Sequence, residues 1–441
     1  MPLTVLSDSE INAILYSLNR DDILNLQNNL ADALHEYSTG TQETTGCCQS
    51  NQPQRIAIPA SNNQTTLFMP ASTSTSRGIK IATLATTQQA PRNDSLPSIK
   101  STTSHTSTTS SSTSTSDPST LASQISNISI GHSTNPDPSI TSSQSTSPIG
   151  SLTLLTATGS PYAFLAASTL TAFRTALTAT LIFTRRANVH TICVFGAGLQ
   201  ALWHIRLALL LRGDEIHHVH IINRNFERAR SLMEQIYTSP AWDALRNSNP
   251  KLDFSIVSNE YGEYTRLLKD HVRKADAILC CTPSTAPLFP AELLTSTEGR
   301  KKGRYVSAIG SYRHNMIELH PDIIRQAVAP EHKHHHHKHA EKSGVIVVDS
   351  LEACMKEAGE VQQAGLNAEQ MVEIGELLMV KKASMLEIEK GGEGEVGLKR
   401  WLQAGNVIFK CVGLGLMDIC VGEDLVMLAR ERGFGTTVDG F

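Results

Sequence analysis

The chain has few cysteines and little surplus charge of either sign. Eight cysteines in 441 residues, with no CxxC spacing, are too few for a disulfide scaffold and suit a reducing compartment. A formal net charge of −4 gives no electrostatic reason to expect nucleic acid as the main partner. The composition therefore argues against secreted, disulfide-held and nucleic-acid-binding proteins, and we expect a cytoplasmic protein.

A long apolar run free of charge is also missing. The stretch from Ser160 to Thr184 comes nearest, but it carries Arg174 at its middle and is rich in serine and threonine. A charge at the centre of a bilayer costs about 2.5–3.5 kcal/mol. We therefore predict a buried helix here and no contact with a membrane. The N-terminal stretch lacks the basic and apolar regions of a signal peptide, so no secretory signal is expected either.

Two tracts of biased composition interrupt the chain. Between Ser101 and Thr120, 17 of 20 residues are serine or threonine. Such a tract cannot bury enough apolar surface to offset the entropy of ordering, so we predict a disordered insertion over residues 90–148. A histidine-rich tract spans residues 332–339. Clustered imidazoles can bind metal, but a flexible run has no second layer of contacts to fix their geometry, so we predict a solvated loop and no metal site.

Between these tracts, short apolar runs alternate with helical patterns. The sequence predicts strands at His190–Phe195, His218–Ile222, Phe254–Val257, Ala277–Cys281, Tyr305–Ile309 and Val345–Val348. It predicts helices at Gly196–Leu211, Phe226–Ile236 and Tyr264–Val272. Such alternation indicates an α/β fold with a doubly wound parallel sheet, which we place at residues 176–350. The flanking pieces, 1–175 and 351–441, are expected to form one discontinuous α+β domain from both chain ends.

A glycine-rich turn follows the first of these strands. Gly196, Ala197, Gly198, Leu199 and Gln200 lead to Ala201 and open a helix, which matches the GxGxxA form of the dinucleotide-binding fingerprint. The first glycine permits the tight turn and the second lets the backbone approach a pyrophosphate, which the helix N-terminus attracts. The alternative is a structural turn made of small residues.

The end of the second strand bears on the choice of nucleotide. NAD sites place an acid there for the ribose hydroxyl, but this chain has Asn223 and Arg224, with no carboxylate before Glu227. Because an arginine can bind a 2′-phosphate, the sequence favours NADP(H) over NAD(H). Arg224 could instead be an exposed arginine at the start of a helix.

The fourth strand ends in Cys280, Cys281, Thr282, Pro283 and Ser284. Small hydroxyl residues at this edge typically line the nicotinamide side of the crevice, so we assign Cys281, Thr282 and Ser284 to the cofactor site. Neither thiol needs to be reactive, because buried cysteines usually behave as small apolar residues.

Four further motifs resemble those of the ornithine cyclodeaminase/mu-crystallin family, in the expected order around the glycine turn. They are Arg55 in the segment QRIAIP, Gly78-Ile-Lys80, Thr171-Ala-Phe-Arg-Thr175, and Lys410-Cys-Val-Gly413 followed by Asp418. The resemblance covers nearly the whole chain apart from the two biased tracts. It implies a homodimer in which both chain ends form the domain for substrate binding and dimerisation.

The resemblance also implies that Arg55, Lys80 and Arg174 surround the carboxylate of a small imine or amino-acid substrate. Two guanidinium groups can hold a carboxylate by paired hydrogen bonds. Lys80 is the one of the three able to exchange a proton, which makes it the candidate catalytic residue. The structural alternatives are a surface arginine at position 55 and a strand-edge lysine at position 80. Arg174 lies inside an apolar helix, so its charge needs a hydrogen-bonding or acidic partner under either interpretation.

The chain also departs from the family pattern. Tyr312 stands where true cyclodeaminases carry the aspartate that handles the substrate's terminal amine, and His314-Asn315, Ala166-Ala167 and Cys411 differ as well. We therefore expect an NADP(H)-dependent oxidoreductase that acts on C–N bonds, reducing a cyclic imine or ketimine carboxylate or oxidising the matching amino acid. The alternatives are an ornithine cyclodeaminase that uses NAD and a non-catalytic, nucleotide-bound binding protein like mu-crystallin.

Overall fold

The computed structural model describes residues 2–40, 49, 52–60, 64–85, 148–310, 313–329, 344–378 and 393–441. Nearly all of the predicted insertion (residues 90–147), the histidine-rich tract 332–339 and Tyr312 lie outside the described residues.

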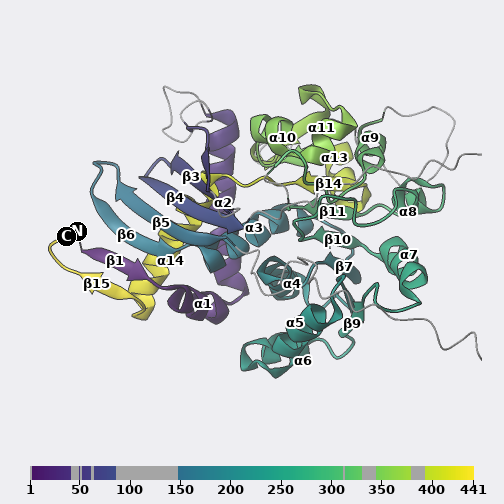
Figure 1. Cartoon of the computed structure of the whole chain (residues 1–441), viewed down its shortest axis with the longest axis horizontal. Helices are drawn as coiled ribbons and strands as arrows, with labels where there is room; N and C mark the ends of the chain where they lie inside the picture. Colours follow the sequence, from purple (N-terminus) through teal and green to yellow (C-terminus); the bar gives the residue numbers. More distant parts are fainter. Residues whose placement is uncertain are drawn as a thin grey trace, which may run out of the picture. The chain divides into compact units, whose positions relative to one another are not determined.

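The first of two sheets is built from both ends of the chain (Figure 1). Its order is β15-β1-β6-β5-β4-β3-β2. These strands are β1 (Leu3–Leu6), β2 (Ile56–Pro59), β3 (Gln64–Ser72), β4 (Ser76–Ala85), β5 (Ile149–Thr156), β6 (Pro161–Ala166) and β15 (Thr436–Val438). Strands β2 to β6 form an antiparallel meander, and β4 pairs directly with β5, so the sheet is continuous across residues 86–148.

Four long helices accompany this sheet: α1 (Asp8–Ser17), α2 (Arg20–Thr39), α3 (Ser168–Phe183) and α14 (Gly415–Arg432). Helix α14 packs across β3, β4 and β5, and α2 packs against α14. Alternate residues of each strand face α14, so Lys80 on β4 and Leu152 on β5 are buried, while their neighbours in sequence are less so.

The second sheet is parallel throughout and has the order β13-β12-β14-β11-β10-β7-β8-β9. Its strands are β7 (Thr191–Phe195), β8 (His218–Ile222), β9 (Asp253–Val257), β10 (Ala277–Cys280), β11 (Tyr305–Ala308), β12 (Ile346–Val348), β13 (Met371–Glu373) and β14 (Val407–Lys410). The prediction of a doubly wound α/β fold is confirmed. From β7 the chain adds β8 and β9 on one side and then crosses back to add β10 on the other side of β7. Ligands bind at such a switch point in open α/β sheets.

Further helices among the described residues connect the strands of the second sheet. They are α4 (Leu199–Arg212), α5 (Phe226–Thr238), α6 (Asp243–Ser248), α7 (Tyr264–Lys274), α8 (Glu292–Thr295), α9 (Pro321–Val328), α10 (Leu351–Glu357), α11 (Gly359–Ala364) and α13 (Glu393–Ala404). Single turns of 3₁₀-helix lie at Pro240–Trp242, Gly299–Lys301 and Ala368–Gln370.

The structure differs from the sequence prediction in two places. The stretch Ser160–Thr184, predicted as one buried helix, begins with strand β6 before α3 starts at Ser168. The C-terminal piece, expected to return to the first domain, also supplies β13 and β14 to the second sheet. Every residue of β14 is buried, as is usual for an interior strand of a parallel sheet. Only α14 and β15 at the very end return to the first sheet.

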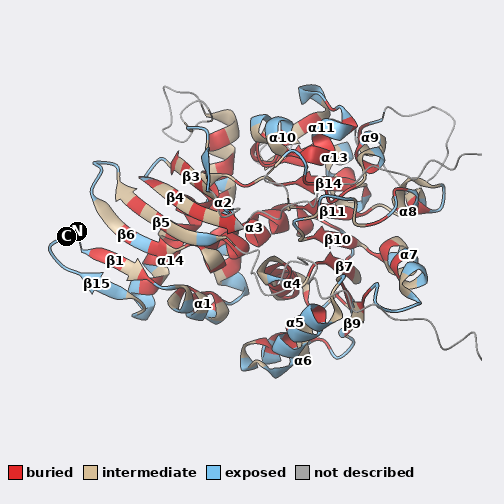
Figure 2. Ribbon diagram, viewed as in Figure 1, coloured by how far each residue is buried: buried red, intermediate tan, exposed pale blue. Residues whose placement is uncertain are grey.

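Helix α3 joins the two sheets. Every residue from Thr169 to Phe183 is buried, and the helix packs against α4 on one side and α14 on the other (Figure 2). The hydroxyl of Tyr305 on β11 donates a 2.7 Å hydrogen bond to the carbonyl of Ala179. Threonine hydroxyls within the helix are satisfied by carbonyls one turn earlier, as Thr178 is by Arg174. Within the described ranges, no helix has the length and apolarity needed to cross a bilayer.

Candidate functional site

One cavity collects most of the residues that the sequence singled out. It measures about 1040 Å³ with its open mouth included. Its walls come from β3 and β4, from α3, from the start of α4, and from the segments that follow β10, β11 and β14. Among its lining residues are Arg55, Lys80, Arg174, Gly198, Leu199, Gln200, Cys281 and Thr282. The proposed substrate residues and part of the proposed cofactor residues therefore share one space.

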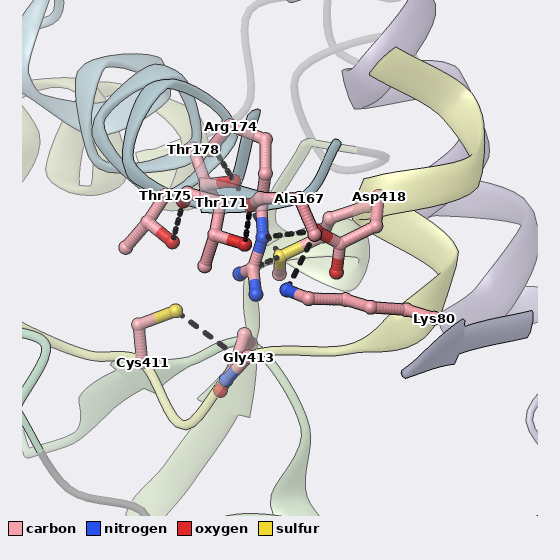
Figure 3. Close-up of polar contacts among 11 residues, drawn as sticks. Lys80, Ala167, Thr171, Arg174, Thr175, Thr178, Cys411, Gly413 and Asp418 are labelled. Carbon is pink, nitrogen blue, oxygen red and sulfur yellow. Dashed lines mark hydrogen bonds and ion pairs between the residues drawn. The ribbon is translucent and has the colours of Figure 1, made fainter. Parts of the chain in front are cut away.

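Two of the three cations meet on one buried carboxylate (Figure 3). The Nζ atom of Lys80 donates to Oδ1 of Asp418 at 2.8 Å, and the Nε atom of Arg174 donates to the same oxygen at 3.2 Å. Asp418 lies in the first turn of α14, and its side chain is 0% exposed. This aspartate is the partner that an arginine inside an apolar helix requires.

The surroundings of Lys80 favour loss of its proton. Burial lowers the pKa of its ammonium group to about 8, and the nearby charges of Arg174 and Arg55 act in the same direction, whereas Asp418 raises it. An amine with a pKa close to neutral can exchange a proton with a bound molecule during a reaction.

Arg55 is held by a different acid. It directly precedes β2, and its Nε atom donates to Oε1 of Glu357 on α10 at 2.9 Å, with a second ion-pair contact through Nη2. Burial lowers the pKa of the guanidinium to about 10, so it stays charged at neutral pH. Glu357 lines a smaller adjoining pocket that shares Arg55 and Gly413 with the main cavity.

The turn after β14 lies against the guanidinium of Arg174. Gly413 has φ +95°, and a Cβ atom there would lie 3.0 Å from Nη2 of Arg174. The buried carboxylate of Asp349 holds this turn by accepting the backbone N–H groups of Val412 at 3.1 Å and Gly413 at 2.6 Å. A glycine is needed here both for the backbone conformation and for the close approach of the arginine.

The glycine turn between β7 and α4 has the geometry of a phosphate-binding site. Gly196 has φ +108°, and a Cβ atom there would lie 2.7 Å from the carbonyl oxygen of Cys281. At Gly198, in contrast, nothing lies within 4 Å of such an atom. Gly198 caps α4 without a side-chain hydrogen bond, so the first N–H groups of the helix can receive an anion. These residues fit a pyridine dinucleotide.

Comparisons with known proteins found relatives among imine reductases. No family model matches the chain. A Δ1-pyrroline-2-carboxylate reductase of Bacillus cereus is 28% identical over 291 residues, which cover 64% of this chain and 71% of the reductase. Ketimine reductase mu-crystallin of Rattus norvegicus is 24% identical over 267 residues, 60% of this chain and 64% of the crystallin. The resemblance to the ornithine cyclodeaminase/mu-crystallin family that the sequence motifs indicated is thus confirmed.

A solved structure shows the same fold. It is that of Thermococcus litoralis Δ1-pyrroline-2-carboxylate reductase in complex with NADH and L-proline. The two chains superpose with a TM-score of 0.61 at 16% sequence identity, over 99% of this chain and 100% of the reductase.

Some of the predicted cofactor residues lie outside the cavity lining. Gly196 and Ala197 form the turn beneath it, while Asn223 follows β8 and donates from Nδ2 to the carbonyl of Asn225 at 2.7 Å. Arg224 is exposed next to it. The Ser284 hydroxyl donates to the carbonyl of Ala286 at 2.6 Å, within its own loop.

Burial raises the pKa of both Cys280 and Cys281 well above the usual thiol value. Neither cysteine is therefore a thiolate at neutral pH.

A buried glutamate beside the cavity was not predicted from the sequence. Glu318 accepts the backbone N–H of Thr282 at 2.7 Å through Oε1 and that of Gly310 at 2.7 Å through Oε2. It thus ties together the chain segments that follow β10 and β11, and both of its partners line the cavity. The available signal was an acid in the segment after β11, but the sequence did not indicate which backbone groups it would bind. Glu357 and Asp349 were missed for the same reason.

The two glycines of the turn allow a matched test. We expect Gly196→Ala to lower the free energy of unfolding by about 1–3 kcal/mol, because the new side chain meets Cys281 and its φ is unfavourable. Gly198→Val should change the free energy of unfolding by no more than about 1 kcal/mol, because its side chain meets no other protein atom. It should weaken the binding of NADH and NADPH, because the same side chain would fill the space where the pyrophosphate approaches the backbone. Denaturant unfolding and nucleotide fluorescence titration measure the two effects. Unchanged nucleotide binding by Gly198→Val would remove the turn from the cofactor site.

Proposed function

We propose that this chain is a pyridine-nucleotide-dependent oxidoreductase that acts on C–N bonds. Its substrate would be a cyclic imine or ketimine carboxylate in the reductive direction, or the matching amino acid in the oxidative direction. The observation that carries the proposal is the shared cavity, whose lining includes the three cations Arg55, Lys80 and Arg174 together with Gly198 and Thr282. The relatives named above, a pyrroline carboxylate reductase and a ketimine reductase, support the same class of reaction.

In this proposal each cation has a distinct role. Arg55 and Arg174 bind the substrate carboxylate, which fixes the position of the neighbouring C=N carbon. Lys80 donates its proton to the imine nitrogen. A bound dihydronicotinamide supplies the hydride for the carbon. The backbone at Gly198 and the N-terminus of α4 bind the pyrophosphate.

The first test is turnover. The purified chain is mixed with NADPH or with NADH and a panel of cyclic imine carboxylates, and the absorbance of the reduced nucleotide is followed. We expect consumption with at least one imine. Formation of proline and ammonia from ornithine with catalytic NAD would instead identify a cyclodeaminase. Nucleotide binding without any turnover would favour a binding protein.

We also propose that the nucleotide is NADP(H), with Arg224 binding the 2′-phosphate. The support is an exposed arginine directly after β8, with no acid at the end of this strand. We expect Arg224→Ala to raise the KM for NADPH about 10-fold, because a charge-assisted hydrogen bond is lost, and to leave the KM for NADH unchanged. Arg228→Ala, which removes another exposed arginine one turn later, is the control. Equal effects on both nucleotides would contradict the assignment.

The proposed carboxylate clamp is tested at Arg174. We expect Arg174→Met to lower kcat/KM for the imine by about 10- to 100-fold through a higher KM, because a charged hydrogen bond contributes about 1.5–3 kcal/mol. Nucleotide binding should persist. Arg206→Met is the control, since Arg206 is also buried on a helix but donates to the carbonyls of Ala241 and Tyr16, away from the cavity. Normal turnover by Arg174→Met would remove this residue from the clamp.

We further propose a homodimer formed through the first sheet. Its outward face presents Phe164, which is 44% exposed, and Ile149, which is 69% exposed. Helix α14 covers the opposite face. A second copy of the chain would bury these apolar side chains, consistent with the role of both chain ends in dimerisation that the family resemblance implies.

A further inference from the structure

Asp418 is a buried acid with one paired and one unpaired carboxylate oxygen. Its Oδ1 atom accepts hydrogen bonds from both Lys80 and Arg174. Its Oδ2 atom is buried and has no hydrogen-bond partner within the part of the chain that the structure describes. Leaving a buried carboxylate oxygen unpaired costs free energy, and such groups concentrate where function requires them.

The location of Asp418 separates it from the substrate. Asp418 does not line the cavity, whereas Lys80 and Arg174 do. It reaches the reacting atoms only through these two neighbours. The ammonium group of Lys80 has three N–H donors, and Asp418 is the one acceptor that the structure gives it among the described residues. The remaining donors are available to a molecule in the cavity.

We propose that Asp418 is a positioning residue of the reaction, which orients the Lys80 ammonium group toward the cavity and keeps it protonated until a substrate binds. The inference rests on the proposed function, in which Lys80 is the proton donor. In the reductive direction one proton leaves Nζ of Lys80 and forms the N–H bond of the product, while the imine carbon receives a hydride. Lys80 then regains its proton from solvent.

The charges around Lys80 give the direction of the effect. Asp418 faces it from α14, Arg174 from α3, and Arg55 from the segment before β2. Burial and the two arginines lower the pKa of Lys80, and Asp418 alone among these groups raises it. Removing the negative charge must therefore move this pKa further down. Because the protonated amine is the active form in imine reduction, activity falls as the pH rises through the pKa, and this fall should occur at a lower pH in the variant.

The experiment compares Asp418→Asn with Asp424→Asn. Asp424 lies on the same helix, is 6% exposed, and accepts a 2.8 Å hydrogen bond from Asn29, so its variant reproduces the loss of a buried acid elsewhere on α14. The pH profile of kcat/KM for imine reduction is measured for both variants and the wild type. We expect the alkaline limb of the Asp418→Asn profile to move down by about one pH unit or more, and that of Asp424→Asn to stay in place. A lower rate with an unmoved limb would overturn the proposal.

A second variant addresses the possibility of misfolding. Asp418→Glu keeps the charge but moves the carboxylate, so we expect its alkaline limb to match the wild type while kcat falls. Nucleotide fluorescence titration reports whether each variant is folded. An Asp418→Glu profile shifted as far as that of Asp418→Asn would overturn the proposal, because geometry and not charge would then control the limb.

A measurement that needs no turnover separates this inference from the proposed function. The rate of acetylation of Lys80 by acetic anhydride is followed against pH by peptide mass spectrometry, with Lys80→Arg to assign the peptide. We expect an inflection near pH 8 in the wild type, at the pKa given above, and at a lower pH in Asp418→Asn. If no imine is reduced but this shift is found, the proposed reaction fails while the control of Lys80 by Asp418 stands. Identical inflections overturn that control.

Discussion

The arrangement of the cavity depends on two buried ion pairs that share one acid, those of Asp418 with Lys80 and with Arg174. Removing an isolated charge from water costs several kcal/mol, so each of these side chains requires the others to be in place. Lys80 and Asp418 are 338 residues apart, and Arg174 and Asp418 are 244 apart. The two pairs therefore join a strand from the first part of the chain, the helix between the two sheets and the last long helix. A fold without α14 would leave both cations in the core without this carboxylate.

Buried acids also fix the wall that the second sheet contributes. Asp349 holds the turn after β14 by its backbone N–H groups, and this turn brings Gly413 against the guanidinium of Arg174. Glu318 joins the chain after β10 to the chain after β11 in the same way. Backbone N–H groups beyond the end of a parallel strand have no partner in the neighbouring strand. A buried carboxylate accepts their hydrogen bonds from behind, so the cavity in front of them is not filled. The cavity thus stays open while its rim is held in place.

Local features of the sequence were enough to predict some of these structural elements, but not others. The turn at Gly196 could be predicted because its conformation, the strand before it and the helix after it are set by adjacent residues. Arg174 could be recognised from the sequence as a residue that needs a partner. Asp418 could not be identified as that partner, because two residues 244 positions apart share no local sequence pattern. The position of β14 inside the second sheet was missed for a similar reason. Strand β6 was hidden because an apolar strand next to an apolar helix shows a single uninterrupted hydrophobic stretch.

The contact between Lys80 and Asp418 also depends on the register of β4, which is followed by a long connection. Residues 86–148 separate β4 from β5, yet the two strands pair from Ser76–Thr156 to Thr83–Ile149. The entropy cost of closing a connection grows only with the logarithm of its length, so the extra residues weaken this pairing little. Length alone, however, would not prevent a slip of one residue, which would turn Ile79 or Ile81 toward α14 and Lys80 outward. Such a slip would break the 2.8 Å contact between Lys80 and Asp418, although Arg174 would still pair with Asp418. The Lys80–Asp418 contact therefore exists in one register of β4, and this register sets the position of the amine in the cavity.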